Sequence, residues 1–119
     1  MTSHLHLIAG CDAKPVTEVI RDFKRHTATT LLSAIENNPQ ESRREWMMER
    51  FRKAGSQNPH NWQYQFWQQD NYPFELYSQQ VIEQKTRYIY DNPVVAGMVQ
   101  DAEAYLYSTC SKHCPLQVM

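Results

Sequence analysis

The spacing of hydrophobic residues changes along the chain between a period of two and a period near 3.6. Residues 4–9 alternate polar and apolar side chains, and residues 64–68 do so again, which predicts two half-buried strands. Helical spacing predicts one helix over about residues 15–36 and another over about 42–55. Ser78 predicts the cap of a third helix, which we expect to end near Asp91 because Pro93 disfavours helix at the residue before it. The pattern therefore indicates one α+β domain.

The first predicted strand places its side chains on two faces. His4 and His6 would project from one face, and Leu5 and Leu7 would point from the other into a core. A lone strand leaves its backbone groups unpaired and needs neighbours. We therefore expect that partner strands come from later in the chain or from another subunit, or that they have been lost.

Composition is compatible with a single domain that has no membrane partner. The chain has 119 residues, of which 41% are hydrophobic and 21% charged, with a formal net charge of -1. No apolar run approaches the ~20 residues needed to span a bilayer. Cys11, Cys110 and Cys114 are too few and too unevenly placed for a disulfide framework. We expect a cytoplasmic protein.

Charge is unevenly distributed despite the neutral average. The stretch from Lys14 to Lys53 has nine Lys or Arg against six Asp or Glu, and the rest of the chain has three against seven. A local basic region is a weak indication of an anionic partner.

The histidine pair is the first candidate for chemistry. Two imidazoles at positions i and i+2 of a strand, as His4 and His6 would be, offer two ligands to a transition metal, or to Mg²⁺ or Mn²⁺ if oxygen ligands join them. Two nearby surface histidines without a ligand role are the commoner case, so the pair alone is a weak signal.

The second candidate lies on the third predicted helix. Tyr88 and Asn92 are four residues apart and share a helix face. A tyrosine can attack phosphorus when a metal polarises the phosphate, and an asparagine oxygen one turn away could complete the metal site. The ordinary alternative is a packing tyrosine followed by an asparagine that stops the helix before proline.

The two candidate segments together resemble a known family. MTSHLHLI is similar to the histidine–hydrophobic–histidine motif of the single-tyrosine HUH transposases, and YIYDNPVVAGMV (88–99) resembles the catalytic-helix motif of their REP-associated tyrosine transposase branch. DFKRHT (22–27), ESRREW (41–46) and FWQQDNYP (66–73) look like blocks of the same branch. The resemblance covers residues 1–109, a transposase-like catalytic domain, and leaves 110–119 as a divergent tail.

The resemblance implies a specific chemistry. His4, His6 and Asn92 would bind Mg²⁺ or Mn²⁺, and Tyr88 would be the nucleophile. The family cleaves single-stranded DNA beside a hairpin through a 5′-phosphotyrosine intermediate and then rejoins strands, commonly as a homodimer. The implied fold is a ferredoxin-like antiparallel sheet with helices on one face. We expect this sheet to be incomplete, because the chain opens at the histidine strand without the strand–helix–strand that precedes it in the family.

Further residues are candidates for contacts with DNA. They are Arg21, Lys24, Arg25, Arg43, Arg44 and Trp67. The alternative for the basic ones is a solvated helix face, and the alternative for the tryptophan is a place in the core. The donor types in the segment from Cys110 to Cys114 form one short cluster, which makes a zinc site improbable. Two alternatives to the transposase remain open: a non-enzymatic DNA-binding remnant, and a metal-dependent hydrolase that uses the histidine pair.

Overall fold

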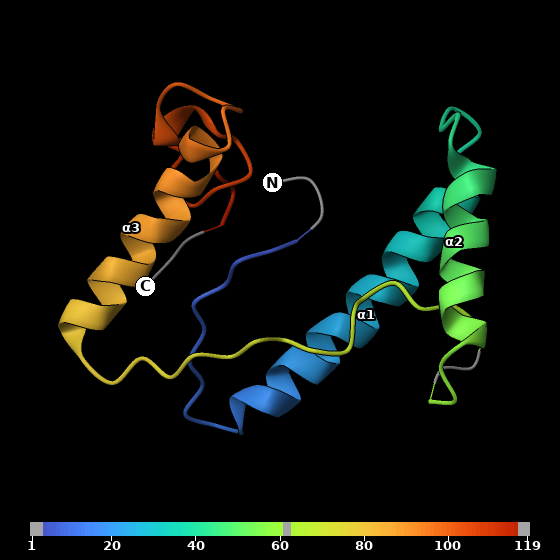
Figure 1. Ribbon diagram of the computed structural model, residues 1–119, viewed down its shortest axis with the longest axis horizontal. Helices are drawn as coiled ribbons and strands as arrows, with labels where there is room; N and C mark the ends of the chain where they lie inside the picture. Colours follow the sequence, from blue (N-terminus) through green and yellow to red (C-terminus); the bar gives the residue numbers. More distant parts are fainter. Residues whose placement is uncertain (1–3, 61–62, 117–119) are drawn as a thin grey trace. The chain divides into compact units, whose positions relative to one another are not determined.

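The computed structural model describes residues 4–60 and 63–116, and the regular secondary structure in these ranges is helical. It comprises α1 (Val16–Glu36), α2 (Arg44–Ser56), α3 (Gln79–Val95) and the 3₁₀ turn η1 (Ala102–Ala104), shown in Figure 1. Because the described ranges contain no strand, the expected α+β, ferredoxin-like sheet is wrong. No helix in these ranges is both long enough and apolar enough to cross a membrane.

Both segments expected to be strands lack regular secondary structure. An alternating pattern forms a strand only where another backbone pairs with it, and residues 4–8 and 64–68 have no such ladder within the described ranges. Gln65 N instead donates to the carbonyl of Phe51, a residue of α2, at 3.0 Å. Leu5 and Leu7 are 54% and 56% exposed, so their expected place in a core is also wrong.

The chain divides into two compact units, which are described separately. The hairpin unit comprises residues 9–72 and contains α1 and α2. The tyrosine unit comprises residues 1–8 and 73–119 and contains α3 and η1.

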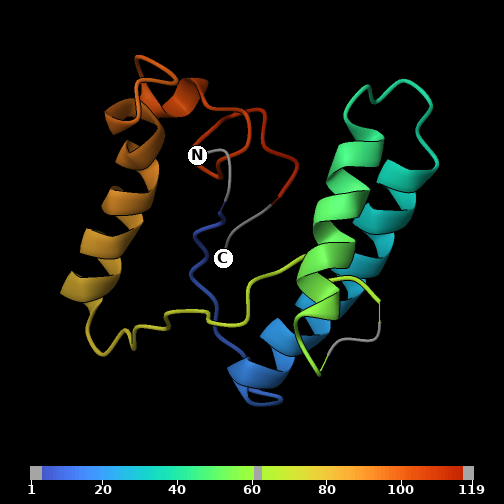
Figure 2. The same cartoon turned by 45° about the vertical axis from the view of Figure 1, so that its right-hand side comes forward.

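In the hairpin unit, α1 and α2 lie side by side and run antiparallel, as Figures 1 and 2 both show. Residues 63–72 return along them. The indole Nε1 of Trp67 donates to Thr27 Oγ1 of α1 at 2.9 Å, and the rings of Phe66 and Phe51 are 5.1 Å apart. Met48 of α2 is buried at 6% exposure. Packing of this returning segment on the helices therefore holds the unit together.

Three helix ends of the hairpin unit agree with the sequence pattern, whereas α2 begins at Arg44, two residues after the expected start at 42, with no side-chain hydrogen bond at its cap. α1 begins directly after Pro15 and ends at Glu36, which confirms the first predicted helix. α2 ends one residue after Gly55, which is buried against the returning segment. A Cβ at Gly55 would lie 2.7 Å from the backbone oxygen of Gln63, so the close approach requires glycine.

In the tyrosine unit, α3 begins as the sequence predicts and ends later. Ser78 Oγ accepts a hydrogen bond from Val81 N at 3.3 Å, which confirms the predicted cap. The expected end near Asp91 is wrong, because α3 continues through a buried Pro93 to Val95. Proline removes one N–H donor from the helix, but later amides still bond; Ala96 N donates to Asn92 O at 2.9 Å.

Candidate active site

The two histidines of the candidate site lie next to each other. The ring centroids of His4 and His6 are 5.0 Å apart, and the ring planes are perpendicular. His4 is exposed and His6 is half-buried. The expected juxtaposition of the two imidazoles is therefore present, although the segment that carries them is not part of a sheet.

Tyr88 of α3 meets this histidine pair. Its ring centroid is 5.5 Å from that of His6, with an angle of 80° between the planes. The Tyr88 side chain is still 56% exposed. An edge-to-face contact of this kind stabilises the arrangement of the two rings, and the remaining exposure leaves the tyrosine accessible to solvent.

The electrostatic environment of His6 favours a neutral imidazole. Burial, and secondly the charge of His4, lower its pKa below 6.5. The Nε2 atom is buried and has no hydrogen-bond partner among the described residues. A buried polar atom without a partner calls for an explanation. A neutral imidazole nitrogen of this kind is the form that binds metal ions.

Asn92 lies one turn beyond Tyr88 on α3. Because the helix continues through Pro93, Asn92 has helical backbone and lies about 6 Å further along the axis on the same face. Its side chain is half-buried. The structure thus brings the His6 ring into contact with the rings of His4 and Tyr88, and Asn92 lies one turn beyond Tyr88 on α3.

The donor types fit a divalent cation. Two imidazole nitrogens and one amide oxygen are compatible with Mn²⁺, and with Mg²⁺ if further oxygen ligands join. In the part of the chain that the structure describes, no three His, Cys, Asp or Glu side chains gather where they could hold a metal ion. The candidate site combines two such side chains, His4 and His6, with the amide of Asn92.

The predicted DNA-binding residues of α1 lie in the hairpin unit. Arg21 forms an ion pair with Asp22 at 3.2 Å, and Lys24 Nζ donates to the carbonyl of Gln68 at 2.6 Å. Arg25 is exposed. Arg21 is therefore partly neutralised, and Lys24 also tethers the returning segment to α1.

The remaining predicted DNA-binding residues have mixed surroundings. Arg43 pairs with Glu41 at 3.2 Å, and this hydrogen bond lowers the pKa of the Glu41 carboxyl. Arg44 is half-buried at the start of α2. Trp67 is half-buried and bonded to Thr27, so its indole contributes to packing within the hairpin unit.

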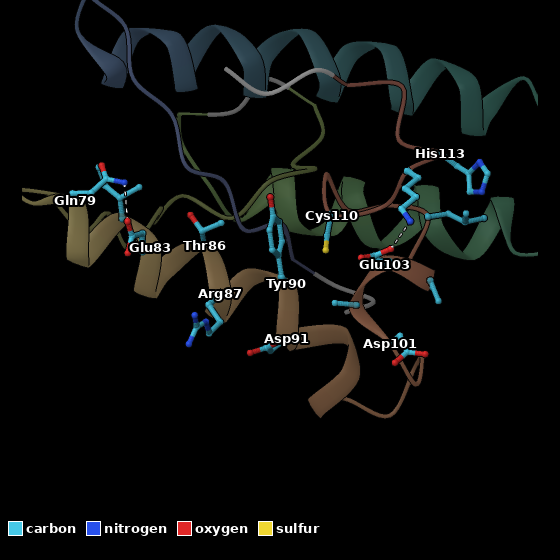
Figure 3. A pocket seen from close by; sticks show the side chains of 15 residues that line it. Gln79, Glu83, Thr86, Arg87, Tyr90, Asp91, Asp101, Glu103, Cys110 and His113 are labelled. Carbon is cyan, nitrogen blue, oxygen red and sulfur yellow. Dashed lines mark hydrogen bonds and ion pairs between the residues drawn. The ribbon is translucent and has the colours of Figure 1, made fainter.

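An open groove of about 1210 Å³ lies beside α3 in the tyrosine unit (Figure 3). It is lined by one face of α3, by η1 and by residues from 106 to 113. Its charges are mixed, with four acidic and two basic residues in the lining: Glu83, Asp91, Asp101 and Glu103 against Arg87 and Lys112. Sequence reasoning missed this groove because residues 101–113 carry no motif that marks them. The mixed charges do not select one class of ligand.

A second feature that sequence reasoning missed is an aromatic–cation pair. The Lys85 ammonium lies 4.6 Å from the ring centroid of Phe74, which precedes α3. The available signals were an aromatic residue directly after Pro73 and a lysine three residues before Tyr88.

No protein-family model matches the chain, and neither a curated protein nor a solved structure shows significant similarity to it. The resemblance of its two motifs to the HUH transposases, and the residue roles that the resemblance implies, stay predictions.

Proposed function

We propose that this protein is a metal-dependent tyrosine transposase that cleaves and rejoins single-stranded DNA, as its resemblance to the REP-associated branch implies. One observation supports the proposal above the others: the ring of Tyr88 lies against His6, which is itself beside His4. His6 and Tyr88 are 82 residues apart in the sequence. A nucleophile beside two candidate metal ligands is the arrangement that the chemistry needs.

Tyr88 forms the covalent link in this proposal. Its phenolic oxygen attacks the scissile phosphorus, a bond from that oxygen to phosphorus forms, and the bond from phosphorus to the 3′-oxygen breaks. The phenol proton passes to solvent, and the departing 3′-oxygen takes up a proton. One phosphodiester replaces another, so the free 3′-hydroxyl can later attack the link and rejoin strands without an external energy source.

Mg²⁺ or Mn²⁺ is the proposed cofactor, held by His4, His6 and Asn92. The ion would supply positive charge to the phosphate that is attacked. Burial, and secondly the charge of His4, lower the pKa of His6 and so favour the neutral imidazole, the form that binds a metal ion. Tyr88 and Asn92 are four residues apart within α3, so the helical geometry sets the spacing of these two side chains, and Ser78 caps this helix.

The hairpin unit has a complementary role in this proposal. Its exposed arginines, Arg25 among them, would contact phosphates of a hairpin-bearing DNA strand. The resemblance also implies a homodimer, and we include this assembly and a cytoplasmic location in the proposal.

A covalent-trapping experiment tests the function. The full chain is incubated with Mn²⁺ and labelled single-stranded DNA that carries a hairpin, and the products are separated on a denaturing gel. We expect a protein–DNA adduct that Tyr88→Phe abolishes. Tyr90→Phe is the matched control, because Tyr90 lies on the same helix but lines the groove, and it should leave the adduct intact.

Each other outcome contradicts the proposal in a different way. DNA binding without an adduct in the unmodified chain would indicate a binding protein without chemistry. Metal-dependent cleavage that survives Tyr88→Phe would indicate a hydrolase that uses the histidine pair. An adduct that survives His6→Ala would remove the proposed metal ligands from the reaction.

A further inference from the structure

An exposed aromatic ring with a cation on it lies at the start of the tyrosine helix. Phe74 is 59% exposed, and the ammonium of Lys85 lies over its ring, 4.6 Å from the centroid. Tyr77, in the same short segment before α3, is 77% exposed. Single exposed apolar side chains are common on protein surfaces, but an exposed aromatic ring paired with a lysine has the composition of a site for single-stranded nucleic acid.

The position of this pair relates it to the candidate active site. Lys85 lies three residues before Tyr88 on α3, so the two side chains neighbour each other on the helix surface with an axial separation of about 4.5 Å. Phe74 is joined to that surface by its contact with Lys85. All three residues belong to the tyrosine unit.

We propose that Phe74 and Lys85 form a subsite that holds one nucleotide of the DNA strand beside the phosphate attacked by Tyr88. This inference rests on the function proposed above and adds a specific binding position to it. The exposed face of Phe74 stacks on the base, and Lys85 contacts the adjoining phosphate. Glu75 is exposed next to Phe74 and repels phosphate, so the backbone of the strand passes on the Lys85 side.

The same geometry selects single strands. Aromatic stacking accepts any base, because every base has a π face. In a duplex, both faces of each internal base are already covered by its neighbours, so Phe74 has no face to stack on. The subsite therefore favours unpaired DNA without reading its sequence.

Binding is measured separately from chemistry. The full chain carrying Tyr88→Phe, which cannot form the adduct, is titrated into fluorescein-labelled oligothymidylate, and the fluorescence anisotropy is recorded. Adding Phe74→Leu should weaken binding about tenfold, because one stacked base is lost. Adding Lys85→Gln should make the slope of log affinity against log salt concentration shallower by about 0.7, the value for one phosphate contact on a single strand.

Tyr107→Leu is the matched control. Tyr107 is an aromatic residue of the same unit and is 87% exposed, but it contacts Tyr105 and has no lysine on its ring. Its replacement should leave binding unchanged. A labelled duplex should bind Phe74→Leu and its parent equally. Phe74→Tyr, which keeps the aromatic face, should bind like the parent.

The outcomes separate this inference from the proposed function. If the Tyr88 adduct forms but Phe74→Leu binds as tightly as its parent, or Lys85→Gln keeps the full salt slope, the subsite is overturned and the transposase proposal stands. Equal weakening by Phe74→Leu and Tyr107→Leu also overturns the subsite. If the parent does not bind oligothymidylate, both proposals fail. The salt slope of Lys85→Gln decides the question even if Phe74→Leu does not fold.

Discussion

Replacing Gly55 with alanine tests how the hairpin unit is packed. A Cβ at this position would lie 2.7 Å from Gln63 O and 2.8 Å from the Cα of Tyr64. Both are backbone atoms, so neither can rotate away as a flexible side chain would. The returning segment has to move away from α2, and this movement strains the hydrogen bond from Gln65 N to Phe51 O.

The magnitude follows from three opposing contributions. Alanine in place of glycine favours the helix by about 1 kcal/mol. Overpacking against rigid neighbours costs about 1–3 kcal/mol, and weakening one backbone hydrogen bond costs about 1 kcal/mol. We therefore expect Gly55→Ala to lower the free energy of unfolding by about 1–3 kcal/mol. At about 4–8 °C per kcal/mol for a small domain, the Tm falls by at least several degrees.

Urea and thermal unfolding followed by far-UV circular dichroism measure this effect. Gly10→Ala is the matched control, because a Cβ at Gly10 meets no atom within 4 Å. It should leave stability unchanged or raise it by less than about 1 kcal/mol through the unfolded state. If Gly55→Ala unfolds at the same urea concentration as Gly10→Ala, or at a higher one, the close approach of residues 63–64 to α2 is refuted.

Three further predictions concern Ser78, His6 and Cys110 of the tyrosine unit. Ser78→Ala removes the cap of α3 and should lower stability by about 1 kcal/mol, seen as an earlier thermal transition, whereas Ser78→Asp should keep the cap; equal melting of the two variants would contradict it. In the metal-free chain, the NMR titration midpoint of His6 should lie below 6.5 and move back toward that value in His4→Gln, because burial and then the charge of His4 lower the His6 pKa. Because the pKa of His6 is lower in the folded chain than in the unfolded chain, the folded chain loses stability as the pH falls from 6.5 through the folded-state pKa. Cys110 should react with iodoacetamide more slowly than the exposed Cys11, since burial above all raises the pKa of the Cys110 thiol; peptide mass spectrometry gives both rates, and equal rates would refute the shift.

Local signals in the sequence predicted the helices well. Pro15 and the helical spacing after it gave the bounds of α1, and Ser78 marked the start of α3. These features depend on residues close together in the chain. The end of α3 was predicted too early because Pro93 was read by its local preference alone. In the structure the ring of Pro93 is buried, and packing outweighs that preference.

In the candidate site, too, local sequence signals identified some features and tertiary packing decided others. The sequence identified four residues and their helical or alternating spacing, but only the folded chain brings His6 within 5.5 Å of Tyr88. The sequence contains Phe74 and Lys85 but no pattern that pairs them, and no pattern marks the groove beside η1. Each joins segments whose separation in the chain carries no periodic signal.

The sequence by itself determined where α1 and α3 start and which residue types are available for chemistry, because capping, turn formation and helical spacing act within a few residues. Tertiary structure alone decided that the alternating segments at 4–8 and 64–68 do not form strands, because a strand exists only if a distant segment pairs with its backbone. It also decided that His4, His6 and Tyr88 lie together. That arrangement depends on packing between the N-terminal segment and α3, which no local pattern specifies.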